Sequence, residues 1–213
     1  MNEDKNYEIA KLFDRPKVIG CVGNTNEGKS NLLYWMINEL KEKAKEPFKL
    51  YSYGLEADLG ERKINTVGEL ELLKDAIVFL DEFYTLFELY NRKKTAEIEK
   101  IFRRINHPSS NIILVLCGLP QNYNKFVSEK LDCIILKQCT IKGFINGSTM
   151  KDKVVDYKGA ELGSTILRME KNEAIVFDGN HYVPIEIPYM IQFDTKRENP
   201  PIYVTKEDED EKL

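Results

Sequence analysis

The sequence predicts an α/β protein in which helices cover a mainly parallel central sheet. Short apolar runs of strand length alternate along the chain with longer amphipathic stretches of helical period, an order typical of parallel sheets covered on both faces. Near the C-terminal end, two closely spaced apolar runs flank an Asp-Gly-Asn sequence, which predicts an antiparallel hairpin added to the same sheet.

The first half of the chain supplies three of the expected strands. The run "KVIGCVG" at 17–23 is apolar and of strand length, and "SNLLYWMINELKEK" at 30–43 repeats apolar residues at helical spacing. "FKLYSYG" at 48–54 predicts a second strand. The polar segment 55–75 predicts only a short helix near its end. "AIVFLDEF" at 76–83 predicts a buried strand that ends in two acids.

The second half continues the alternation and then leaves it. One long helix is expected at 84–106, ended by the proline of "HPSS". The polar segment 141–169 predicts loops. The remaining expected elements are the strands 111–120, 133–140, 173–179 and 181–187 and the helix 121–132.

Composition indicates a soluble globular chain. Its 213 residues are 42% hydrophobic and 31% charged, enough for one compact domain with a sizeable core, with two small domains as the alternative. No apolar segment is long enough to span a bilayer and no apolar signal core opens the chain, so we expect no integral membrane segment and a cytoplasmic location. The net charge is −4, but acidic residues concentrate at both ends, which leaves room for basic patches between them.

The cysteines and histidines do not predict a metal site. None of the cysteines forms a C-x-x-C pair and both histidines are isolated, so we expect the cysteines to act as small buried hydrophobes. These residues are Cys21, Cys117, Cys133, Cys139, His107 and His181.

The stretch "VIGCVGNTNEGKSNLL" carries the strongest motif. Gly23 and Gly28 frame the spacing G-x-x-x-x-G-K-S between an expected strand and an expected helix, the context of a phosphate-binding P-loop. Lys29 would contact the β- and γ-phosphates of ATP, and Ser30 would place its hydroxyl on Mg²⁺. An ordinary glycine-rich turn is the alternative. The expected nucleotide-binding residues are Gly23, Asn24, Thr25, Asn26, Glu27, Gly28, Lys29, Ser30 and Asn31.

Two acids at the end of the strand 76–83 complete the expected site. Ligands gather outside the carboxyl ends of parallel strands, so Asp81 is the candidate to hold Mg²⁺, directly or through water. Glu82 follows it and is the candidate general base that activates the attacking water. A strand ending in two solvated acids is the alternative.

The tip of one further strand is a candidate for contact with the γ-phosphate. The tip of the strand 111–120 offers Cys117, Gln121 and Asn122, and we favour Gln121 as a sensor over a helix-capping or loop amide.

Arg103 and Arg104 end the helix 84–106, where cations also suit the helix dipole. The functional alternative is an arginine finger donated to a neighbouring subunit, with Arg92 as a weaker candidate.

With these elements in order, the chain resembles the FtsK–HerA superfamily of P-loop ATPases over residues 17–190. The matching sequence segments are "GNTNEGKS", "IVFLDEF", "IFRRI", "VLCGLPQN" and the closing "MEKNEAIVFDGNHYVPIEIPY". The chain departs from the family pattern at Gly118, which stands where the family has a sensor glutamine; the glutamine is displaced to Gln121.

The resemblance implies a P-loop NTPase (RecA-like) fold and an ATP- and Mg²⁺-dependent pump of double-stranded DNA. It further implies a homo-oligomeric ring, a pentamer or hexamer. A motor domain with short ends is most similar to the genome-packaging ATPases of membrane-containing icosahedral viruses. A capsid or membrane vertex protein would then be a partner, in the host cytoplasm or on the virion.

The domain boundaries expected from these motifs are an N-terminal extension at 1–16, a P-loop ATPase domain at 17–195 and an acidic tail at 196–213 that we expect to be disordered. Basic residues proposed to contact DNA are Arg92, Lys93, Lys94, Lys151 and Lys153.

Three other functions remain open. One is a plasmid or phage ATPase for DNA transfer or virus assembly, and another is a non-translocating, nucleotide-dependent P-loop protein. The third is a small-molecule kinase, for which the chain shows neither a lid nor a run of substrate-binding arginines. Dependence of ATP hydrolysis on duplex DNA separates a translocase from the last two.

Overall fold

The computed structural model of the chain describes residues 12–43, 48–56, 60–88, 95–105, 107, 110–139, 165–178 and 181–190. These residues form an eight-stranded sheet with the strand order β3-β2-β4-β5-β1-β6-β7-β8. The strands are β1 (Lys17–Val22), β2 (Lys49–Tyr53), β3 (Arg62–Lys63), β4 (Ala76–Leu80), β5 (Ile112–Gly118), β6 (Cys133–Leu136), β7 (Glu173–Phe177) and β8 (Tyr182–Glu186). The predicted α/β class is confirmed.

The sheet is parallel from β3 through β6 and antiparallel at its C-terminal end. The first strand in the chain, β1, lies at the centre, paired in parallel with β5 on one side and β6 on the other. The strands β6, β7 and β8 pair antiparallel, so the predicted C-terminal hairpin is confirmed. This order places the carboxyl ends of β1, β4, β5 and β6 along one edge of the sheet.

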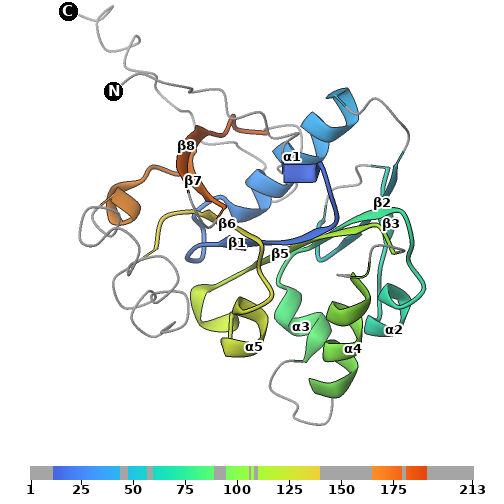
Figure 1. The fold of residues 1–213 in the computed structure, drawn as a ribbon. Coiled ribbons are helices and arrows are strands. Elements are labelled where there is room, and N and C mark those ends of the chain that lie inside the picture. Colours follow the sequence, from blue (N-terminus) through green and yellow to red (C-terminus); the bar gives the residue numbers. More distant parts are fainter. Residues whose placement is uncertain are drawn as a thin grey trace, which may run out of the picture.

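Helices cover both faces of the sheet (Figure 1). The helix α1 (Lys29–Lys43) lies on one face, and α2 (Val67–Leu70), α3 (Phe83–Phe87), α4 (Thr95–Ile105) and α5 (Lys125–Ser128) lie on the other. Side chains of β1 face both sides of the sheet. Val18 and Val22 pack on the side of α2, α3, α4 and α5, and Ile19 and Cys21 pack on the side of α1. A buried strand that faces apolar layers on both sides explains why the run at 17–23 is continuously apolar.

The single long helix expected at 84–106 is wrong. The helix α3 ends at Phe87, because Glu88 follows with a φ of 45°, in the left-handed region that no α-helix continues through. A separate helix, α4, occupies Thr95–Ile105. The periodicity on both sides of the break is helical, so the pattern concealed the interruption.

The helix expected at 121–132 is also divided. A 3-10 turn, η3 (Pro120–Asn122), comes first, and α5 begins only at Lys125. The side chain of Asn124 accepts a hydrogen bond from the backbone N–H of Val127, 3.0 Å away, and so caps the first turn of α5.

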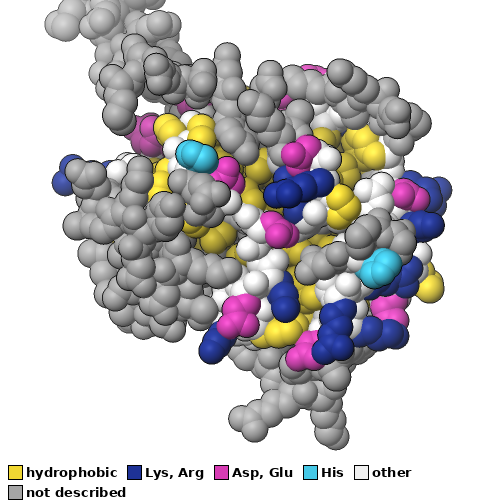
Figure 2. Space-filling view, in the orientation of Figure 1, with side chains coloured by type: hydrophobic (Ala, Val, Ile, Leu, Met, Phe, Trp, Pro, Cys, Tyr) yellow, Lys and Arg dark blue, Asp and Glu magenta, His cyan; other side chains and the backbone are white. Residues whose placement is uncertain are grey.

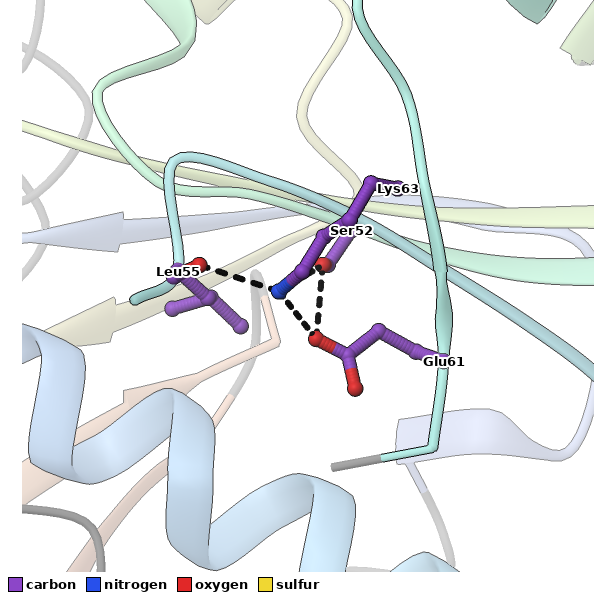
Figure 3. A network of polar contacts seen from close by, with 4 residues as sticks. All are labelled: Ser52, Leu55, Glu61 and Lys63. Carbon is purple, nitrogen blue, oxygen red and sulfur yellow. Dashed lines mark hydrogen bonds and ion pairs between the residues drawn. The ribbon is translucent and has the colours of Figure 1, made fainter. Parts of the chain in front are cut away.

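The edge strand β3 was not predicted, and a buried polar network fixes it to β2 (Figure 3). The carboxylate of Glu61 is buried and accepts hydrogen bonds from the hydroxyl of Ser52 at 2.9 Å and the ammonium of Lys63 at 2.5 Å. Lys63 also donates to the carbonyl of Leu55 at 2.9 Å. Two paired residues are too few to give a strand pattern in sequence, whereas the network supplies the charge partner that a buried carboxylate needs.

All four cysteines are buried, and none of them forms a disulfide. Among the residues described, no helix is both long enough and apolar enough to cross a membrane.

Candidate active site

Residues 23–28 link the end of β1 to α1, and their conformation depends on small or left-handed residues. Gly28 and Asn26 have φ values of 72° and 64°, in the region that glycine adopts freely and asparagine tolerates. At Gly23 the constraint is space: an added Cβ would lie 2.6 Å from the Cβ of Lys137. Glycine is therefore needed at the two framing positions of the motif for different physical reasons.

The tips of neighbouring strands hold this loop in place. The backbone N–H of Asn24 donates to the carbonyl of Gln138, just after β6, at 3.0 Å, and that of Gly23 donates to the carbonyl of Gly118 at 3.4 Å. The first intrahelical bond of α1 runs from Leu32 to Gly28 at 3.0 Å. The loop therefore leads directly into the N-terminus of a fifteen-residue helix, a setting that favours anions.

Lys29 lies across this loop. Its ammonium donates to the carbonyl of Asn24 at 2.6 Å, and the residue is half-buried. The bond keeps a positive charge at the loop, beside backbone amides. This is the arrangement that a polyphosphate requires.

Ser30 and Asp81, expected from sequence to share a metal ion, are brought together. The Ser30 hydroxyl donates to Oδ2 of Asp81 at 2.8 Å, although the two residues lie fifty-one positions apart. Burial raises the pKa of Asp81, and hydrogen bonds from Ser30 and Cys117 oppose that shift. Hydroxyl and carboxylate oxygens are the hard ligands that Mg²⁺ prefers, so the donor set fits that ion.

Within the described residues, no group of three or more His, Cys, Asp or Glu side chains is placed to hold a metal ion. A magnesium ion here would therefore be held by Ser30 and Asp81 together with phosphate oxygens and water. That division is usual for Mg²⁺ in phosphate-handling proteins.

Glu82 stands directly beside this pair, at the start of α3. Its φ of 50° is left-handed, a conformation that costs a non-glycine residue about 1–2 kcal/mol. Its backbone N–H donates to Oδ1 of Asp81 at 3.1 Å. Its exposed carboxylate accepts a hydrogen bond from the Tyr84 hydroxyl at 2.8 Å. The strained turn therefore presents the carboxylate to solvent at the carboxyl end of β4.

Gln121 lies in η3, at the same edge of the sheet, with its side chain exposed. The two alternatives at this tip are buried. Cys117 is hydrogen-bonded to Asp81, and Asn122 is packed near Gly118, whose added Cβ would lie 3.7 Å from the Asn122 amide nitrogen. The tip of β5 lies at the edge expected from the sequence, and a role for Gln121 there stays a prediction, whereas the direct contact between Cys117 and Asp81 had no signal in the sequence.

The remaining loop residues take different directions. Thr25 and Asn26 are exposed, while Glu27 is turned inward, and its buried Oε2 has no hydrogen-bond partner among the described residues. The amide of Asn31 is engaged by the chain after β8: it donates to the carbonyl of Pro188 at 3.0 Å and accepts from the N–H of Met190 at 2.8 Å. Asn31 therefore ties α1 to the C-terminal segment.

Arg103 and Arg104 lie far from the loop of their own chain. They end α4, which precedes the amino end of β5, whereas the loop follows the carboxyl end of β1. The seven residues of β5 separate the two edges by about 20 Å. This is longer than an arginine side chain, so neither arginine can complete its own site.

The two arginines line a cavity of about 480 Å³ together with Lys74, His107 and Ser110. Arg104 donates to the carbonyl of Leu73 at 3.4 Å, and Arg103 lies 3.6 Å from Glu99. Lys and Arg side chains gather, with acidic ones among them, on the side of the molecule where α2 and α4 lie (Figure 2). This basic cavity is at the opposite edge from the loop at residues 23–28.

Several predicted contacts lie outside the described residues. They are the five basic residues proposed to contact DNA, Arg92, Lys93, Lys94, Lys151 and Lys153.

One residue that sequence reasoning missed is Lys137. It follows an apolar strand in "CIILKQCT" and has the appearance of a solvated charge at a strand end, yet the side chain is 0% exposed.

Comparison with solved structures finds the same fold in DNA-handling ATPases. The DNA-packaging ATPase B204 from Sulfolobus Turreted Icosahedral Virus matches with a TM-score of 0.61 and 16% identity, over 83% of this chain and 100% of that chain. The genome packaging NTPase B204 from Sulfolobus turreted icosahedral virus 2, in complex with ATP-gammaS, matches with a TM-score of 0.55 and 18% identity over the same shares.

A third match is the pCW3 conjugation coupling protein TcpA with ATPgS, at a TM-score of 0.56 and 16% identity. It covers 82% of this chain but 61% of that protein, so this chain spans less than two thirds of its length. No protein-family model matches the chain, and no curated protein matches it. At these sequence identities the likeness shows the fold alone. At the level of the fold, it confirms the resemblance drawn from the motifs.

Proposed function

We propose that this chain is a P-loop ATPase that binds ATP with Mg²⁺ and couples its hydrolysis to movement along double-stranded DNA. The contact between the Ser30 hydroxyl and Asp81 at 2.8 Å carries this proposal. It joins the two halves of a nucleotide site, the loop before α1 and the acidic end of β4, across fifty-one residues of sequence. An ordinary glycine-rich turn has no reason to place a serine on a buried carboxylate.

Each residue of the site then has one role. The amides of residues 25–28 and the Lys29 ammonium bind the phosphates, because the amides of Gly23 and Asn24 already donate to the strand tips. Ser30 and Asp81 hold Mg²⁺, which offsets phosphate charge when bound. Glu82 accepts a proton from the attacking water. Gln121, exposed at the tip after β5, orients the γ-phosphate or that water. An arginine from a neighbouring subunit supplies a further positive charge at the γ-phosphate.

Movement of DNA is supported by the matched structures, which include a DNA-packaging ATPase and a conjugation coupling protein. We propose packaging of a viral genome as the specific task. The chain would assemble into a homo-oligomeric ring, a pentamer or hexamer, in the host cytoplasm or on the virion. A capsid or membrane vertex protein would receive the DNA.

The match to a conjugation coupling protein favours a second candidate, an ATPase for plasmid or phage DNA transfer. Both candidates predict ATP hydrolysis stimulated by long duplex DNA, and native mass measurement should find a ring. A non-translocating P-loop protein would hydrolyse ATP at one rate with and without DNA. DNA-independent turnover of a confirmed ring would therefore remove the translocase proposal while keeping the ATPase.

Glu82→Gln is expected to lower ATP turnover by about 10²- to 10⁴-fold, the usual range for losing a general base, with nucleotide binding intact. The amide keeps the size of the carboxylate and its bond to Tyr84, but it cannot take a proton from water. Steady-state turnover and equilibrium nucleotide binding are measured on the same protein.

Glu88→Gln is the matched control, because Glu88 is also exposed and left-handed, at the other end of α3. Hydrolysis by Glu82→Gln at the wild-type rate would place the base elsewhere.

DNA binding is expected to be independent of sequence and to weaken steeply with salt, because a motor that travels along DNA holds phosphates. The logarithm of affinity should fall linearly with the logarithm of salt concentration, with a slope of about −0.9 for each phosphate neutralised. Titrations of labelled duplexes of unrelated sequence, at several salt concentrations, measure that slope. Selective binding of one sequence that persists at high salt would indicate a regulatory DNA-binding protein.

A further inference from the structure

Lys137 lies directly beneath the loop at residues 23–28. Its backbone N–H donates to the carbonyl of Val22 at 2.8 Å, which fixes the residue at the end of β6 beside the last residue of β1. The side chain passes Gly23, where an added Cβ would meet the Cβ of Lys137 at 2.6 Å. The absence of a side chain at Gly23 is therefore what lets Lys137 run under the loop.

Two backbone carbonyls hold the ammonium of Lys137. It donates to the carbonyl of Lys171 at 2.5 Å and to that of Glu173 at 2.7 Å, both in the turn that starts β7. An ideal Cβ on Gly28 would lie 3.8 Å from both Cε and Nζ of Lys137. The buried ammonium thus lies between the loop and the turn at 171–173.

Charged groups on three segments face this lysine. Glu27 of the loop and Glu173 of β7 attract its ammonium, and Lys29 of α1 lies on the other side of Gly23, with its Cγ 3.4 Å from the ideal Cβ there. Burial lowers the pKa of Lys137 to about 8, and the two glutamates oppose that shift. The buried Oε2 of Glu27 has no hydrogen-bond partner among the described residues, and the Lys137 ammonium is a nearby cation that interacts favourably with this carboxylate.

We propose that Lys137 is a positioning residue of the phosphate-binding loop. Its charged form ties the loop to the turn at 171–173 and neutralises Glu27, so that the loop keeps the shape that presents its amides and Lys29 to a nucleoside triphosphate. The inference rests on the proposed function, because it assigns a role within the same nucleotide site. Lys137 contacts no reacting atom in this role.

The arrangement links nucleotide binding to a proton. Triphosphate near the loop adds negative charge, which favours the ammonium form of Lys137. Between the pKa of the free protein and the higher pKa of the complex, binding must therefore take up a proton. Affinity should fall by up to about tenfold per pH unit in that window. With a free-protein pKa of about 8, the fall begins near pH 8.

The test measures binding of a non-hydrolysable ATP analogue by calorimetry between pH 7 and pH 9.5. The Lys137→Met variant keeps the length of the side chain without its charge. At pH 7 its affinity should be about 10- to 100-fold below wild type, the range for losing a group that orients a ligand-binding residue. Its affinity should also lack the fall above pH 8 that wild type shows. Lys125→Met, at an exposed position on α5, is the matched control and should follow wild type throughout.

A second variant, Glu27→Gln, keeps the inference testable if Lys137→Met fails to fold. Removing the carboxylate takes away an attraction that raises the pKa of Lys137, so the fall in affinity should begin at a lower pH than in wild type. A fall that begins at the same pH in Glu27→Gln would overturn the inference. Equal affinity and equal pH dependence of folded Lys137→Met and wild type would overturn it too. In both cases the proposed function stands, whereas a wild-type protein that binds no nucleotide at any pH refutes the proposed function itself.

Discussion

Replacing Lys29 by alanine abolishes ATP hydrolysis while the chain stays folded. This result is expected because, among the described residues, the Lys29 ammonium donates to the carbonyl of Asn24, and in the proposed site it contacts phosphate and not the apolar core. Losing one such bond at a half-buried position costs about 1 kcal/mol of folding stability. The thermal transition should therefore shift only slightly.

The measurement pairs ATP turnover with a thermal unfolding curve. Lys41→Ala is the matched control, because Lys41 is an exposed lysine on the same helix and lies near its C-terminal end, away from the loop at residues 23–28. Normal turnover by folded Lys29→Ala would remove the nucleotide site from this loop. Loss of activity in both variants would indicate damage to α1 and not loss of a phosphate contact.

Arg104→Ala lowers turnover of the assembled protein by about 10³- to 10⁵-fold if Arg104 is the arginine finger. The structure places Arg104 too far from the loop of its own chain, so a finger at this position would have to act in trans. Arg104 lies at the amino edge of the sheet with Lys74 and His107, about 20 Å from the loop of its own chain along β5. A neighbour that docks its loop on this basic cavity would receive the arginine.

Mixing two inactive variants tests this geometry directly. Subunits with Arg104→Ala keep an intact loop, and subunits with Lys29→Ala keep an intact arginine, so an interface between the two should recover hydrolysis. Native mass measurement confirms that mixed assemblies form. No recovery at any ratio in confirmed mixed rings would contradict a finger at Arg104.

Two single variants accompany the mixing experiment. Adjacent helix positions point about 100° apart, so Arg103→Ala should lose far less activity than Arg104→Ala if only Arg104 reaches the phosphate. Lys100→Ala removes an exposed cation of the same helix that pairs with Glu71 at 2.6 Å, and it should retain full turnover. Full activity of Arg104→Ala would move the search to Arg103 or Arg92.

The meeting of Ser30 and Asp81 could be predicted from sequence because it follows from topology alone. Each residue comes just after a buried parallel strand or the loop that follows it, and the carboxyl ends of such strands share an edge of the sheet. No knowledge of side-chain packing was needed. For the same reason the mainly parallel sheet and the closing hairpin were accessible from apolar runs and turn residues, whereas the order of the strands was not predicted.

What could not be predicted depends on local backbone conformation and on burial. The left-handed Glu88 interrupts a helical pattern without changing its period. The two-residue strand β3 depends on a carboxylate, Glu61, that is buried only after Lys63 and Ser52 surround it. From sequence alone Lys137 has the pattern of a solvated charge at a strand end. The carbonyls that bind its ammonium come from a turn thirty-four and thirty-six residues later.

The central position of β1 also sets when the site can form during synthesis. Of the described strands β1 is made first, yet its partners β5 and β6 begin only at Ile112 and Cys133. Pairings so distant in sequence form slowly, because the intervening chain must lose its freedom before the contacts compensate. The nascent loop at residues 23–28 therefore has no scaffold until most of the chain has emerged. Until β5 and β6 are made, the mainly apolar residues of β1 have no partner strands, and unpaired apolar strands of this kind promote aggregation of a growing chain.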